Sequence, residues 1–161
     1  MRLVLALLIA SALAAPALAQ NAGQIAKSKA GASCPGCNLF QADFANAELK
    51  GRNYARARLR QADFSAAVMN RTSFAGADLR DVNAYGAVLG GANFSGADLT
   101  HASFVGAYLQ GASFSGAKLD GTNFSGAEMD RARGLTQHQL DGACGDTSTR
   151  LPLGLHLRDC R

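Results

Sequence analysis

Four cysteines are the residues of this chain best suited to covalent chemistry. Cys34 and Cys37 form a Cys-Pro-Gly-Cys motif, which has the spacing of a thioredoxin-type redox centre. Such a centre requires the first cysteine at a helix N-terminus in a βαβ fold, and no such context surrounds this motif. A local structural disulfide between Cys34 and Cys37 is therefore the simpler interpretation. A second disulfide, between Cys144 and Cys160, would tie down the C-terminal tail.

Residue patterns for other kinds of catalysis are missing from the sequence. It contains no paired carboxylates, nucleophile motif or phosphate-binding loop, and its histidines show no metal-ligand spacing. We therefore expect no enzymatic activity, no cofactor and no metal. The 16 Lys and Arg against 12 Asp and Glu give a formal net charge of only +4 at pH 7, which does not indicate a nucleic-acid partner.

A five-residue repeat organises the chain over residues 32–133. Residues 91–100, Gly-Ala-Asn-Phe-Ser-Gly-Ala-Asp-Leu-Thr, show its rule. A bulky apolar centre follows alanine by two positions, with a small polar residue between them and a turn pair after the centre. A short, strict period indicates a solenoid, in which each repeat packs on its neighbours. The centres are Leu39, Phe44, Leu49, Tyr54, Leu59, Phe64, Met69, Phe74, Leu79, Ala84, Leu89, Phe94, Leu99, Phe104, Leu109, Phe114, Leu119, Phe124 and Met129.

These residues closely resemble the repeat of pentapeptide-repeat proteins, Ala-(Asp/Asn)-Leu-X-X, over residues 32–133. In that family four pentapeptides make one turn of a right-handed quadrilateral β-helix. The resemblance implies an all-β solenoid of about five coils, stacked about 4.8 Å apart. Residues one coil apart would stack on each other, and the aromatic centres would then form columns on two opposite walls.

The N-terminal segment is expected to lie outside this fold. Residues 1–19 carry an early positive charge, an apolar run and a small-residue cleavage pattern, which together are typical of a secretory signal peptide. The protein is therefore expected in the periplasm or outside a bacterial cell, with no transmembrane segment after signal cleavage. Residues 20–31 have no apolar period, so the sequence predicts a flexible tether there.

The repeat ends at residue 133, and residues 134–161 are expected to form a C-terminal cap. Thr136 followed by Gln139 fits a capping box, which predicts a short helix over residues 137–143. This tail, with its two cysteines, resembles the tail of exported bacterial members of the family. One cysteine pair would lie at each end of a rod about 25 Å long, so a zinc site using all four cysteines is not expected.

Two residues depart from the repeat in ways that predict a local change in structure. Ala84 stands where the aromatic column calls for a large side chain, so we expect a local irregularity over residues 82–86 rather than a cavity. Arg52 stands where alanine is the rule, and an unpaired charge inside the coil is too costly, so Arg52 should point outward.

Two surfaces are candidates for binding a partner. One is a basic cluster of five arginines, Arg56, Arg58, Arg60, Arg71 and Arg80, of which Arg58, Arg60 and Arg80 are the candidate binding residues. Arg58 stacks on Asp78 in the repeat frame, whereas Arg60 and Arg80 remain adjacent like charges that could meet an anionic partner. A solvated wall is the simpler interpretation of the cluster. Val68, Val88 and Tyr108 form a small apolar strip where polar residues are usual. The spacing of the residues does not rank these two surfaces.

The sequence thus favours a non-catalytic, exported solenoid that acts as a structural or protein-interaction rod. Its partner would be a protein or a component of the cell envelope. The resemblance also implies an alternative, because the best-known family members imitate DNA and protect type II topoisomerases. The signal peptide and the slightly basic composition oppose that role. Thiol-disulfide chemistry by Cys34 and Cys37 is a third possibility.

Overall fold

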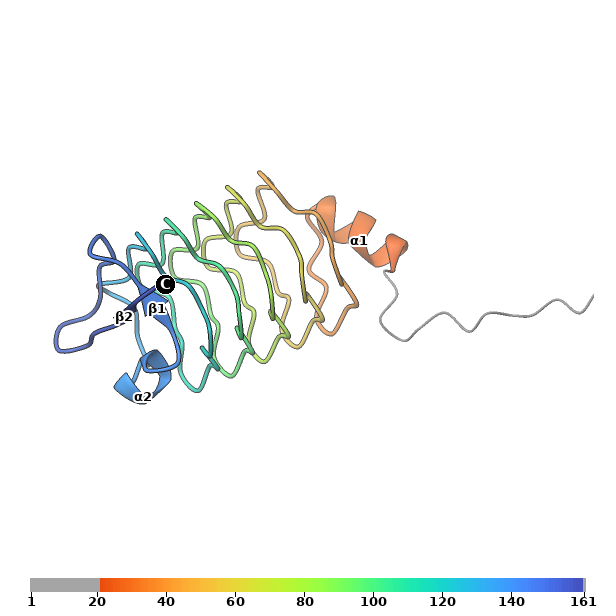
Figure 1. The fold of residues 1–161 in the computed structure, drawn as a ribbon. Helices are drawn as coiled ribbons and strands as arrows, with labels where there is room; N and C mark the ends of the chain where they lie inside the picture. The colour runs from red at the N-terminus through yellow and green to blue at the C-terminus, as the bar shows by residue number, and fades with distance from the viewer. Residues whose placement is uncertain (1–20, 161) are drawn as a thin grey trace, which may run out of the picture.

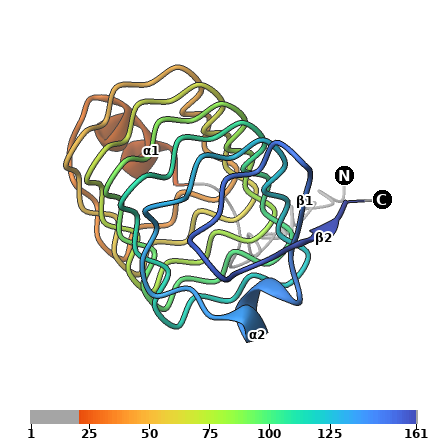
Figure 2. The same ribbon diagram turned by 90° about the vertical axis from the view of Figure 1, so that its left-hand side faces the viewer.

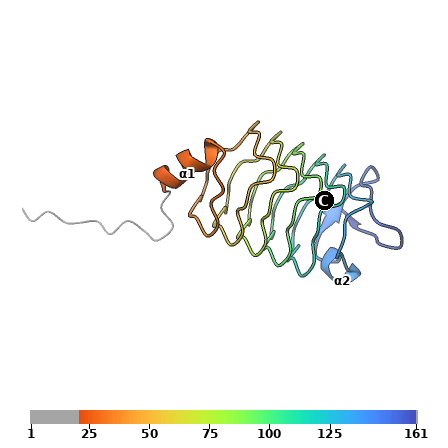
Figure 3. The same cartoon turned by 180° about the vertical axis from the view of Figure 1, so that it is seen from behind.

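The computed structural model describes residues 21–160, so the signal peptide expected at residues 1–19 lies outside the described residues. The named elements are helices α1 (Ala22–Lys29) and α2 (Gln137–Leu140) and strands β1 (Cys144–Gly145) and β2 (Arg158–Asp159). Between α1 and α2 the chain winds into a stack of similar coils, with α1 at one end and α2, β1 and β2 at the other (Figures 1 and 3). Seen along the stack, successive coils follow nearly the same outline (Figure 2).

Parallel pairing between residues one coil apart holds the stack together. From Asn38↔Arg58 to Ser113↔Arg133, each pair joins residues 20 positions apart. The Arg58 N–H donates to the Cys37 carbonyl in the preceding coil, and the Leu59 N–H donates to the Asp78 carbonyl in the following coil, both at 2.8 Å. The predicted β-helix with a twenty-residue coil is confirmed.

The repeat's large residues fill the interior of the stack. Leu, Met and aromatic centres are buried with the alanines that precede them by two positions. One aromatic column runs through Tyr54, Phe74, Phe94 and Phe114, with ring centroids 5.2–5.8 Å apart. Stacked rings at this spacing bury large apolar surfaces without overpacking, because alanine occupies the alternate inward positions.

The small polar residue before each centre stabilises the turn that follows. Asn53 accepts a hydrogen bond from the Ala55 N–H at 2.9 Å, and Asn93 accepts one from the Ser95 N–H at the same distance. Asp98 does the same for the Thr100 N–H at 3.1 Å. Short Asn and Asp side chains are well suited to such turns, which explains their place in the repeat.

The irregularity expected over residues 82–86 is not found. Asn83 pairs with Asp63 and Ser103 in the normal register, and Ala84 is buried between them. Val82, which replaces the usual alanine, is also buried. Valine adds volume to the interior of the coil in which Ala84 removes it, and the coil keeps its regular register.

Arg52 and Thr72 show two ways to replace an inward alanine. Arg52 is exposed, as predicted, and its guanidinium lies beside Gly31, at the end of the N-terminal segment. Thr72, one coil further on, stays inside because its hydroxyl donates to the Leu49 carbonyl at 2.9 Å. A hydroxyl can be buried when it finds such a partner, whereas an unpaired guanidinium cannot.

The tether predicted for residues 20–31 is wrong, because this segment contains α1. The side chain of Asn21 caps the helix by accepting from the Gln24 N–H at 3.1 Å, and the Gln24 side chain accepts from the Asn38 N–H at 2.7 Å. Ile25 packs against the core and Ser28 is fully buried. The helix therefore covers part of the first coil, whose edge would otherwise be exposed to solvent.

The helix of the C-terminal cap begins where predicted, but it ends at Leu140 rather than at residue 143. The Thr136 hydroxyl accepts from the Gln139 N–H, and the Gln139 side chain accepts from the Thr136 N–H. The Gln139 amide also donates to the carbonyls of Phe114 and Ala117, which fixes α2 to the last regular coil. The chain then continues the stack, with Cys144 paired to Asn123 in a shifted register.

Candidate functional site

Both expected disulfides are formed, Cys34–Cys37 and Cys144–Cys160. Cys34 is buried in the first coil and Cys37 is partly buried, so neither is presented as a reactive thiol. Cys144 and Cys160 belong to the other end of the stack, where Cys144 pairs with the last regular coil. Within residues 21–160 no cluster of His, Cys, Asp and Glu is arranged to hold a metal ion.

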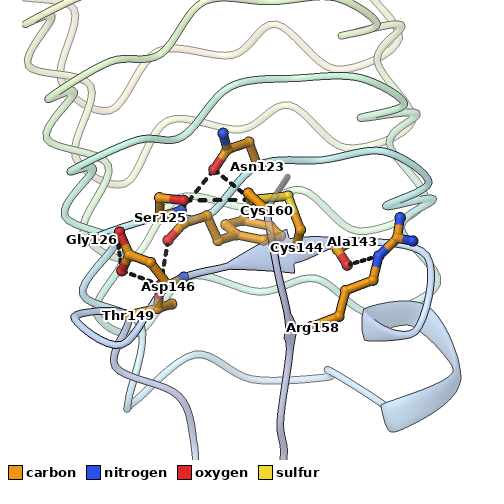
Figure 4. The surroundings of a disulfide bond; sticks show 10 residues. Asn123, Ser125, Gly126, Ala143, Cys144, Asp146, Thr149, Arg158 and Cys160 are labelled. Atoms are coloured by element: carbon orange, nitrogen blue, oxygen red, sulfur yellow. Dashed lines mark hydrogen bonds between the residues drawn. A yellow bond between two sulfur atoms is a disulfide. The ribbon is translucent and has the colours of Figure 1, made fainter.

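The surroundings of the C-terminal disulfide fasten the tail rather than form a reaction centre (Figure 4). A sulfur of the bond lies 3.3 Å from Asn123 Oδ1, and the Arg158 Nε donates to the Ala143 carbonyl at 3.1 Å. Asp146 accepts hydrogen bonds from the Ser148 hydroxyl and the Gly126 N–H, which hold its pKa below the ordinary range. These contacts tie the final loop to the last coil.

The arginine cluster is largely paired with carboxylates of the chain itself. Arg80 holds both carboxylate oxygens of Asp78, each at 2.7 Å, and this contact lowers the pKa of Asp78. Arg60 binds Asp81 at 3.2 Å. Arg58 is exposed and lies in register with Asp78, whose carboxylate is already held by Arg80. Of the three predicted arginines, Arg58 therefore presents the freest charge.

Val68, Val88 and Tyr108 lie in register on three adjacent coils. The two valines are half-buried, and Tyr108 leaves 43% of its surface exposed. Glu48 precedes Val68 in this column and Glu128 follows Tyr108, so charged residues stand at both ends of the apolar strip. The sequence-based placement of the strip is confirmed, whereas its role in binding stays a prediction.

A groove of about 700 Å³ runs beside Tyr108. Asn70 and Arg71 line it on one side, while Gly90 and Gly91 contribute only main chain. A Cβ placed on Gly90 would lie 2.9 Å from Asn70 Oδ1 and 3.0 Å from the Tyr108 ring, so a side chain there would crowd the groove. The repeat pattern did not predict this groove. Its signal was the one Gly-Gly pair in the chain, which removes both side chains of a turn.

Some polar side chains of the groove already form hydrogen bonds or ion pairs within the protein, and others do not. The Lys50 Nζ lies 3.6 Å from the Glu48 Oε2 and forms an ion pair with it. The Gln110 amide donates to Asp130, and its oxygen accepts from the Arg131 N–H at 3.1 Å. In contrast, the side chains of Asn70 and Arg71 form no hydrogen bond or ion pair with any residue of the described range 21–160. The groove thus offers an amide and a guanidinium to a ligand.

Comparison with known proteins shows to which family this chain belongs. Residues 37–114 match a family model described as a pentapeptide repeat region, and residues 97–133 and 107–144 match a model of pentapeptide repeats. A pentapeptide repeat protein from the Arabidopsis thaliana thylakoid lumen is 30% identical, over 70% of this chain and 79% of that one, with a TM-score of 0.58. The chain belongs to the pentapeptide-repeat family.

Other pentapeptide-repeat structures are less similar to this chain. One from Nostoc is 28% identical over 85% of this chain and 88% of that one, with a TM-score of 0.37. QnrB1, a plasmid-mediated fluoroquinolone resistance protein, is 23% identical over 68% of this chain and 79% of that one, with a TM-score of 0.26. Comparison with curated proteins gave no match.

Membership of the pentapeptide-repeat family accounts for the buried columns and the turns. It does not account for the Gly90-Gly91 pair, because the other repeats of this chain carry at least one side chain in the turn. None of the helices within residues 21–160 has the length and hydropathy needed to cross a membrane.

Proposed function

We propose that this pentapeptide-repeat protein is a non-catalytic, exported rod that binds a protein or another component of the cell envelope through its lateral surface. The observation that carries the proposal is that both ends of the stack are covered. Helix α1 lies on the first coil, and α2 with the disulfide-tied tail lies on the last (Figure 1). Covered ends do not favour end-to-end addition, so the walls are the surfaces available to a partner.

The proposed export and the finer architecture rest on the sequence. Residues 1–19 have the pattern of a secretory signal peptide, and two disulfides suit an oxidising compartment such as the periplasm. The repeat of the family implies a right-handed, quadrilateral helix of about five coils at ordinary strand spacing. These statements form part of the proposal.

The face that contains Tyr108 is the favoured binding surface. Tyr108 is exposed at the end of the Val68–Val88 strip and borders a groove whose Asn70 and Arg71 side chains have no partner in residues 21–160. Exposed aromatic residues and arginines contribute most to binding interfaces. The arginine cluster is a second candidate surface, with Arg58 as its most accessible charge, because Arg60 and Arg80 are engaged by Asp81 and Asp78.

The alternative functions have less support. Imitation of DNA for topoisomerase binding needs an acidic surface, and the chain has a formal net charge of +4. Thiol-disulfide exchange by Cys34 and Cys37 needs an accessible sulfur with a lowered thiol pKa, and Cys34 is only 8% exposed. Neither alternative makes use of the groove.

Chemical crosslinking in the native bacterium, followed by mass spectrometry, tests the proposal. The wild-type protein is compared with Tyr108→Ser and with a triple variant in which Arg58, Arg60 and Arg80 are changed to serine. We expect a partner that is captured by the wild type and lost with Tyr108→Ser. If the partner is lost only with the triple variant, the binding site is the arginine cluster and not the face that contains Tyr108. Identical products from all three proteins would contradict binding at either surface.

A further inference from the structure

We propose that the groove beside Tyr108 binds an acidic saccharide, a sugar chain whose rings carry carboxylates. This inference rests on the proposed function, since it names the chemical class of the envelope component at the favoured surface.

The main chain on this wall is already used by the stack. Val88 pairs with Val68 on one side and with Tyr108 on the other, and the Val88 N–H donates to the Ala67 carbonyl at 2.8 Å. An extended peptide usually adds to a sheet through unpaired N–H and C=O groups at its edge. Because the coils consume these groups in pairing with each other, a ligand on this wall must be recognised mainly through side chains.

A sugar ring suits the apolar and polar surfaces that remain. The exposed ring of Tyr108 offers apolar surface to the C–H groups of a sugar, and the side-chain position of Gly91 leaves room for a ligand near the main chain. The Asn70 amide has both a donor and an acceptor for hydroxyl groups. An exposed aromatic ring beside an unpartnered amide therefore favours a ligand with alternating apolar and hydroxyl surfaces.

The charge of the groove selects an acidic sugar over a neutral one. The Arg71 side chain is exposed, and its Cγ would lie 3.5 Å from a Cβ on Gly91, so its stem passes along the empty turn. A guanidinium matches the two oxygens of a carboxylate in a fork-like contact. Lys50 adds a second cation at the far end of the groove, although Glu48 lies 3.6 Å away.

The length of the groove suits more than one sugar unit. Lys50, Asn70, Gly90 and Gln110 occupy equivalent positions in successive coils, so the groove extends about 14 Å along the stack at ordinary strand spacing. Its volume of about 700 Å³ lies in the usual range for small-ligand sites. A short oligomer lying along the stack would contact Arg71 and Tyr108 together.

Titration calorimetry with a short oligomer of galacturonic acid tests the inference on the purified protein. We expect saturable binding, with at least about tenfold weaker binding of the neutral galactose oligomer, because a hydrogen-bonded charge pair is lost. Arg71→Gln and Tyr108→Ser should each weaken binding by about tenfold. Gly91→Gln should also weaken it by placing a side chain in the groove. The backbone can accept glutamine there, since Gln41 and Gln61 have similar positive φ values.

Each variant has a matched control elsewhere on the rod. Arg56 stands at the equivalent repeat position and its Cγ lies near Gly76 as that of Arg71 lies near Gly91. Arg56→Gln controls for the loss of one charge. Tyr85, which is 61% exposed, gives Tyr85→Ser as the control for the aromatic ring. Gly96→Gln controls for the strain of a side chain at positive φ. All three controls should bind the oligomer as the wild type does.

Three results would overturn the inference. They are no binding of the galacturonate oligomer, equal affinity for the neutral oligomer, or a loss of affinity with Arg56→Gln equal to that with Arg71→Gln. Binding of a poly-glutamate peptide with the same affinity would also overturn it, because the site would then recognise any polyanion. Capture of a partner at Tyr108 in cells without saccharide binding would leave the proposed function intact and remove only the saccharide. Failure of both experiments would remove the two proposals together.

Discussion

One edge of the Tyr108 ring lies against Gly90, so close that a Cβ on this glycine would come within 3.0 Å of the ring. Tyr108 and Gly90 belong to adjacent coils, and their contact depends on the missing side chain. The Asn70 amide oxygen lies in the same space, 2.9 Å from that Cβ position, and both side chains line the groove. One small residue in a turn therefore sets the positions of an exposed aromatic ring and of an amide without a partner in residues 21–160.

Gly90→Ala should change the groove more than it changes stability. The φ angle of Gly90 is not among the positive values, so alanine can adopt this backbone conformation. The atoms in its way are the Asn70 amide oxygen and the Tyr108 ring edge, which belong to partly exposed side chains. We expect the free energy of unfolding in urea to change by less than about 1 kcal/mol, while affinity for the galacturonate oligomer falls. A loss of several kcal/mol with full affinity would contradict this account.

The two disulfides should contribute unequally to stability. Cys144–Cys160 spans 16 positions and Cys34–Cys37 spans 3. Loop-closure entropy predicts losses of about 3 kcal/mol and about 2 kcal/mol when each pair is replaced by serine. Urea unfolding of the two double variants measures the difference. A greater loss for the Cys34–Cys37 pair would show that the N-terminal end depends on its disulfide more than the C-terminal tail does.

Ala84→Phe should destabilise the protein, even though phenylalanine restores the aromatic column. Ala84 is fully buried in a coil of normal register, and Val82 already fills part of the nearby space. Extra volume in a packed interior costs about 1–3 kcal/mol. The double variant with Val82→Ala should recover much of this loss. Stabilisation by Ala84→Phe alone, measured by urea unfolding, would reveal an unfilled cavity instead.

The Asp78–Arg80 pair should make stability depend on acidity. The contact lowers the folded-state pKa of Asp78 below the unfolded value of about 3.9. Its contribution is therefore complete above about pH 4 and is lost as pH falls through the lower folded-state pKa. Asp78→Asn should reduce the loss of stability between neutral pH and the acid range, as measured by urea unfolding. Asp120→Asn is the matched control, because the Asp120 carboxylate forms no ion pair within residues 21–160. An equal acid response in wild type and Asp78→Asn would contradict the prediction.

The sequence predicted the features set by the repeat, by a local capping pattern or by the cost of burying a charge. The core columns followed from the spacing of large residues, because any other register would expose them. The start of the helix predicted over residues 137–143 followed from Thr136 and Gln139, which interact locally, whereas α2 ends at Leu140. The outward position of Arg52 followed from the cost of burying its charge.

The features that the sequence did not predict each have a physical reason. Helix α1 was missed because Ile25 is its one large apolar residue, and the helix gains its stability from contact with the first coil rather than from its own pattern. The regular path of residues 82–86 depends on how Val82 and Ala84 share space, which one-dimensional spacing does not describe. The groove was missed because a repeat pattern marks the side chains that are present, whereas Gly90 and Gly91 act through those that are absent.

The most direct test of the central claim is site-specific photo-crosslinking in cells that produce the protein naturally, with the photoreactive residue at position 108 or at position 85. Both positions carry exposed tyrosines on the walls of the same rod, and only Tyr108 borders the groove. The account predicts a crosslinked product from position 108 that is absent from position 85 and is lost when Arg71→Gln is added. No product from position 108, or the same product from both positions, would contradict binding at this face.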